Sequence, residues 1–110
     1  MADTSPYDQA KELVRQLNSI LSSMDIDSLS REERDLAIGI KQLFDHVRLG
    51  ARDYDYADTR YEQEQSAVET KQHLEQLQAS ILKASEYNLF GAVDVAHASA
   101  RIQQLVSQLK

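Results

Sequence analysis

The feature that most constrains this chain is a pair of amphipathic stripes that follow each other over residues 74–109. Their apolar residues alternate spacings of three and four, which is typical of a helix with one buried face and not of a strand. The stripes are Leu74, Leu77, Ile81 and Ala84, then Val95, Ala98, Ile102, Leu105 and Leu109, with Val106 beside the second. Between them lies Gly91, and a Gly just past a helix can adopt the left-handed conformation that ends it. The pattern therefore predicts a helical hairpin folded back at Gly91.

Two more helices are predicted upstream by start signals that precede stripes of the same spacing. Ser5 followed by Pro6 indicates a helix that ends near Met24, because Ser caps free amides and Pro favours the first helical position. Ser30 and Glu33 form a capping box, in which each side chain accepts a hydrogen bond from the other residue's backbone amide. We therefore expect a second helix to begin at Ser30.

The segment between Gly50 and Asp58 has two interpretations. As a loop, it ends the second helix, and Thr59 with Glu62 forms a capping box that begins a third helix reaching Asn88. As a helix, it continues the three-four spacing and gives one helix of roughly sixty residues, against a usual mean of about 11–12. We expect the break.

These elements together predict an all-α, antiparallel bundle of about four helices, in a single domain over residues 1–110. The hairpin of the last two helices is expected to be its main packing unit. One Pro and three Gly are too few turn residues for an all-β chain of 110 residues. No apolar run approaches the roughly 18 residues of a membrane helix, and the N-terminus lacks the features of a secretory signal. We therefore expect a cytoplasmic protein that does not bind membranes.

Charge and cysteine content exclude several classes of function. The net charge is −6, and the twelve Lys and Arg residues are scattered singly. A nucleic-acid-binding protein normally gathers such residues on one face, so nucleic acid is not an expected partner. The chain has no Cys, which excludes disulfides, thiolate catalysis and Cys-based zinc sites.

No catalytic, cofactor-binding or metal-binding residue is predicted. The Gly residues are isolated and no Ser lies in a Gly-x-Ser-x-Gly elbow, so phosphate loops and that type of nucleophile are missing. His46, His73 and His97 all fall on polar helix faces without a second ligand set, and we expect them to be solvent-exposed. A calcium loop starting at Asp53 fails at Ala57 and Asp58, where an oxygen ligand and a Gly are required. We therefore do not expect an enzyme.

One stretch, which we call the acidic tyrosine segment, stands out over residues 53–69. It holds six carboxylates against Arg60 alone, a net charge of −5. Its tyrosines interleave with these acids, and Tyr is enriched at interaction surfaces. The residues expected to contact a partner are Tyr54, Tyr56, Asp53, Asp55, Asp58 and Tyr61. The alternative is that Tyr54 and Tyr61 only end a core stripe.

The sequence thus favours a non-enzymatic protein-interaction module, an adaptor or a chaperone-like binder of a basic or helical protein partner. Two alternatives remain open. One is a helical bundle that binds a small ligand or a metal in its core. The other is a structural homo-oligomer, in which an apolar stripe pairs with its own copy.

Overall fold

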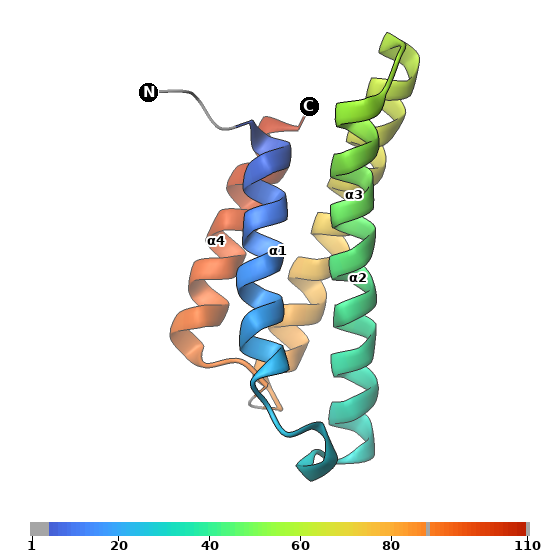
Figure 1. Cartoon of the computed structure of the whole chain (residues 1–110). Helices are drawn as coiled ribbons and strands as arrows, with labels where there is room; N and C mark the ends of the chain where they lie inside the picture. The colour runs from blue at the N-terminus through green and yellow to red at the C-terminus, as the bar shows by residue number, and fades with distance from the viewer. Residues whose placement is uncertain (1–4, 88, 110) are drawn as a thin grey trace.

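A computed structural model describes residues 5–87 and 89–109 and gives four helices in an antiparallel bundle. The helices are α1 (Pro6–Ser22), α2 (Arg31–Tyr56), α3 (Arg60–Ser85) and α4 (Ala92–Gln108), and a short 3₁₀ turn, η1, covers Ile26–Ser28. Consecutive helices run in opposite directions, and α1 lies beside α4 to close the ring (Figure 1). The predicted all-α bundle is confirmed. None of the described helices is long and apolar enough to cross a membrane.

The most extensive helix pairing is between α2 and α3. Both have 26 residues, whereas α1 and α4 have 17 each, so α2 and α3 can stay in contact over a greater length. The predicted α3–α4 hairpin also packs closely, but its contact is smaller. Because α2 and α3 are the two longest helices and are joined by a short turn, they form a larger packing unit than the predicted α3–α4 hairpin.

The core is formed by the predicted stripes. Every residue of the α3 and α4 stripes is buried, and Val106 packs against them half-buried. The two N-terminal helices add a matching set: Leu13, Val14, Leu17, Leu21, Ala37, Ile40, Phe44 and Val47. All of these side chains belong to one apolar cluster at the centre of the bundle.

The first two helices begin at the predicted caps. The Ser5 hydroxyl accepts a hydrogen bond from the Asp8 amide at 3.1 Å. In the second cap, the Glu33 amide donates to the Ser30 hydroxyl and the Ser30 amide donates to the Glu33 carboxylate, each at 3.2 Å. These signals predict well because they act within one helical turn.

The break between α2 and α3 is present, but it is shorter and later than predicted. Helix α2 continues through Gly50 to Tyr56, and only residues 57–59 separate it from α3. Gly50 and the following Ala51 are buried within the bundle, so packing outweighs the low helix propensity of Gly. Thr59 caps α3 as predicted, accepting from the Glu62 amide at 3.1 Å. The Glu62 carboxylate, however, accepts from the amide of residue 58 at 3.3 Å, so the box is displaced by one residue.

The connection between α3 and α4 also differs from the prediction. Helix α3 ends at Ser85, and the predicted end at Asn88 lies outside the described residues. Gly91 has φ −66° and ψ 155°, so its backbone is extended, not left-handed, and it forms the N-cap of α4. Leu89 and Phe90, just before it, are buried in the core. Burial of these two side chains anchors the connection to the core.

Candidate functional site

The end of the α2–α3 pair projects beyond the rest of the bundle. A 26-residue helix is about 39 Å long and a 17-residue helix about 25 Å. The turn between α2 and α3 therefore extends past the start of α1 and the end of α4, which lie at the same end of the molecule (Figure 1). We call this projecting end of the α2–α3 pair the tip.

A shallow depression of about 330 Å³ lies on the tip, between the last turns of α2 and the first turns of α3. Two tyrosines form part of its wall, one from each side of the turn. Tyr56 is 77% exposed and Tyr61 is 70% exposed, although both are large aromatic side chains. The complete lining, which we call the tip depression, is Asp53, Tyr56, Ala57, Tyr61, Glu62, Gln65, Ser66 and Glu69.

The tip depression is acidic. Asp53, Glu62 and Glu69 line it, and none of its lining residues is Lys or Arg. The ion pairs of the region use other carboxylates: Lys11 binds Asp55, and Arg60 binds Glu64 across the outside of α3. Within the described residues, no cation forms an ion pair with the three lining carboxylates. Their negative charge is therefore open to a cation from outside.

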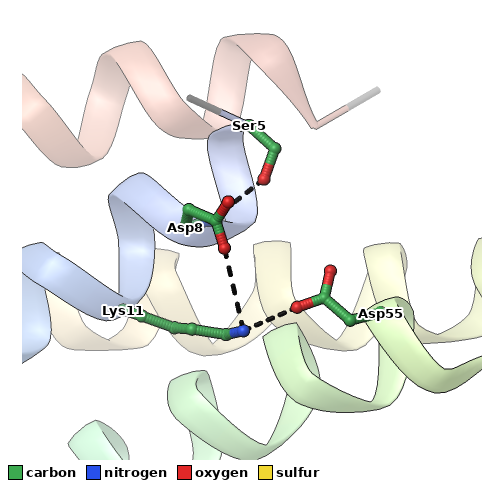
Figure 2. Close-up of polar contacts among 4 residues, drawn as sticks. All are labelled: Ser5, Asp8, Lys11 and Asp55. Atoms are coloured by element: carbon green, nitrogen blue, oxygen red, sulfur yellow. Dashed lines mark hydrogen bonds and ion pairs between the residues drawn. The ribbon is translucent and has the colours of Figure 1, made fainter. Parts of the chain in front are cut away.

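Tyr54 and Asp55 do not belong to the tip depression, because both face α1. The Tyr54 ring stacks on Tyr7 with centroids 3.8 Å apart and an interplanar angle of 12°. Asp55 accepts from the Lys11 ammonium at 2.6 Å, and Asp8 lies 3.8 Å from the same ammonium (Figure 2). Burial, together with Tyr54 and Asp55 nearby, raises the pKa of Tyr7 to about 12, so this ring stays neutral.

The alternative interpretation, in which Tyr54 and Tyr61 only end a core stripe, holds for one of these tyrosines and not for the other. Tyr54 is half-buried and packs against the core, as that interpretation requires. Tyr61 is exposed and does not end a core stripe. Of the other expected contact residues, Asp53 and Tyr56 line the tip depression, and Asp58 lies exposed in the turn beside it.

Of the α3 residues in this site, only Tyr61 was predicted to contact a partner. Glu62, Gln65, Ser66 and Glu69 line the tip depression from one face of the helix. Their spacing of three and four is the signal that could have grouped them. It was overlooked because a polar stripe at the start of a helix resembles an ordinary solvated face.

The three histidines also separate. His46 and His97 are exposed, as predicted. His73 is half-buried, which corrects the prediction, and its ring centroid lies 4.9 Å from that of His46 across the α2–α3 pairing. Among the described residues there is no group of three or more His, Asp or Glu side chains placed to hold a metal ion.

Comparison of the chain with protein-family models, with curated proteins and with solved structures gives no match.

Proposed function

We propose that this protein is a non-enzymatic interaction module whose tip depression binds a Lys- or Arg-containing segment of a partner protein. The observation that carries the proposal is the combination of two exposed tyrosines with three carboxylates that have no ion-pair partner among the described residues. The adaptor and chaperone-like roles are both forms of such a module.

Each component of the tip depression suits a basic side chain. A cation over an exposed aromatic face gains about 0.5–1 kcal/mol per ring. The carboxylates of Asp53, Glu62 and Glu69 add attraction that speeds association and suppresses acidic competitors. Tyr rings also supply a rigid apolar area that loses little conformational freedom on binding. Because the tip projects from the bundle, an extended segment can reach it without displacing α1 or α4.

Removing both exposed rings should weaken the binding of a basic peptide. The variant Tyr56→Ser with Tyr61→Ser keeps every charge, so it tests the rings alone. Two cation–π contacts correspond to about 1–2 kcal/mol, and we expect the Kd to rise about 5- to 30-fold. The measurement is fluorescence anisotropy with a labelled oligo-arginine peptide, alongside circular dichroism to show that helical content is unchanged.

The controls separate this site from general charge attraction. Val93→Ser removes another exposed apolar side chain, 82% exposed on α4, and should leave the Kd unchanged. Asp53→Asn with Glu69→Gln should weaken binding mainly at low salt, because screening already reduces these contributions at higher ionic strength. The proposal is wrong if the tyrosine variant binds oligo-arginine as tightly as the unmodified protein, or if oligo-glutamate binds equally well.

A further inference from the structure

Two histidines face each other across the most extensive helix contact of the bundle. His46 comes from α2 and His73 from α3, with ring centroids 4.9 Å apart and planes tilted by 41°. His46 is exposed and His73 is half-buried. The Nδ1 atom of His73 is buried and has no hydrogen-bond partner within the described part of the chain.

The charged groups around this pair do not offset the cost of protonating His73 in its half-buried position. His46 approaches from α2, and Glu69 lies one turn away on α3. Beside His46, Asp45 is already paired with Arg48 at 2.8 Å. The other helix against α3 is α4, and none of its described residues adds a charged group to those that act on His73. Among the described residues, Glu69 is therefore the one group whose charge favours a proton on His73, against burial and a second imidazole.

We propose that the His46–His73 contact is an acid-sensitive element of the α2–α3 pairing, stable when both rings are neutral and opposed when they are protonated. A protonated imidazole donates from both nitrogens. The buried Nδ1 of His73 would then carry a proton with no acceptor, which is a costly arrangement in a half-buried position. Two imidazolium rings at this distance also repel each other.

The direction of the pH effect follows from the same surroundings. Burial, and then the neighbouring His46, lower the pKa of His73 below its usual 6.5, while Glu69 opposes them. As the pH falls, His73 takes up its proton in the unfolded chain before it does so in the folded protein. The contribution of neutral His73 to folding stability is therefore fully present above pH 6.5 and is lost as the pH falls through the folded-state pKa. For each pH unit between the two pKa values, the folding equilibrium constant drops about tenfold.

The direct test compares urea unfolding at pH 7.5 and pH 5.5 for the unmodified protein and for His46→Gln with His73→Gln. We expect the midpoint of the unmodified protein to fall further on acidification than that of the double variant. Carboxylates other than Glu69 contribute alike to the unmodified protein and the double variant, so their effect cancels in the comparison. His97→Gln is the matched control, since His97 is exposed on α4, and it should keep the full pH dependence.

A second measurement needs only folded protein and no comparison of stabilities. An NMR titration should place the pKa of His73 below 6.5, and His46→Gln should raise it by removing the neighbouring positive charge. Equal pH dependence in the unmodified protein and the double variant would overturn the proposal. So would a His73 pKa at or above 6.5, which remains measurable even if the double variant fails to fold.

Discussion

Replacing Ile102 with Ala is expected to lower the free energy of unfolding by about 2–5 kcal/mol. Ile102 is fully buried at the middle of the α4 stripe, and its neighbours in the core cluster cannot all move to fill the space it leaves. The loss therefore combines the transfer free energy of the removed carbons with the cost of a cavity. Ile81→Ala on α3, which is 1% exposed, should fall in the same range. Urea unfolding followed by circular dichroism measures both.

The control for this prediction is Val93→Ala on the same helix. Val93 is 82% exposed, so the change should stay within about 0.5 kcal/mol of zero. If Ile102→Ala left the unfolding midpoint as it is, the α4 stripe would not form the buried face described here.

The second large effect is expected from opposite responses of two glycines in α2 to the same substitution. Gly39→Ala should stabilise the protein by about 0.5–1 kcal/mol, because a Cβ there meets nothing within 4 Å and Ala favours the helix. At Gly50 an added Cβ would lie 2.5 Å from the Thr70 hydroxyl oxygen, which already donates to the Ser66 carbonyl. Overpacking of this kind costs about 1–3 kcal/mol. We therefore expect the free energy of unfolding of Gly50→Ala, measured in urea, to lie about 1–3 kcal/mol below that of Gly39→Ala.

The clash at Gly50 can be assigned to one atom by changing its partner. Thr70→Ala removes the hydroxyl, and the remaining Cβ lies at an ordinary 3.5 Å. In that background Gly50→Ala should no longer destabilise the protein. Thr70→Val keeps a branched side chain of similar shape, so the penalty should persist. Equal penalties in the Ala and Val backgrounds would show that Gly50 is constrained by something other than Thr70.

At the candidate site, sequence reasoning found the segment but not the arrangement of its side chains. The interleaved acids and tyrosines identified Asp53, Tyr56 and Tyr61, all of which line the tip depression. The same pattern could not separate Tyr54 from them. Its partner, Tyr7, is 47 positions away in the chain and meets it only because α1 packs against α2.

The sequence by itself determined where α1 and α2 begin and which apolar stripes of the last two helices are buried. Caps such as Ser5 and Ser30 act within one helical turn, and an apolar stripe marks a face whatever it packs against. The tertiary structure decided how these faces meet: the Gly50–Thr70 approach, the Tyr7–Tyr54 stack and the His46–His73 contact. Each depends on the rotation and axial register of two helices. The packing of the whole core sets this rotation and register. An apolar stripe specifies which face of a helix is buried, but not the axial position at which the neighbouring helix packs against it.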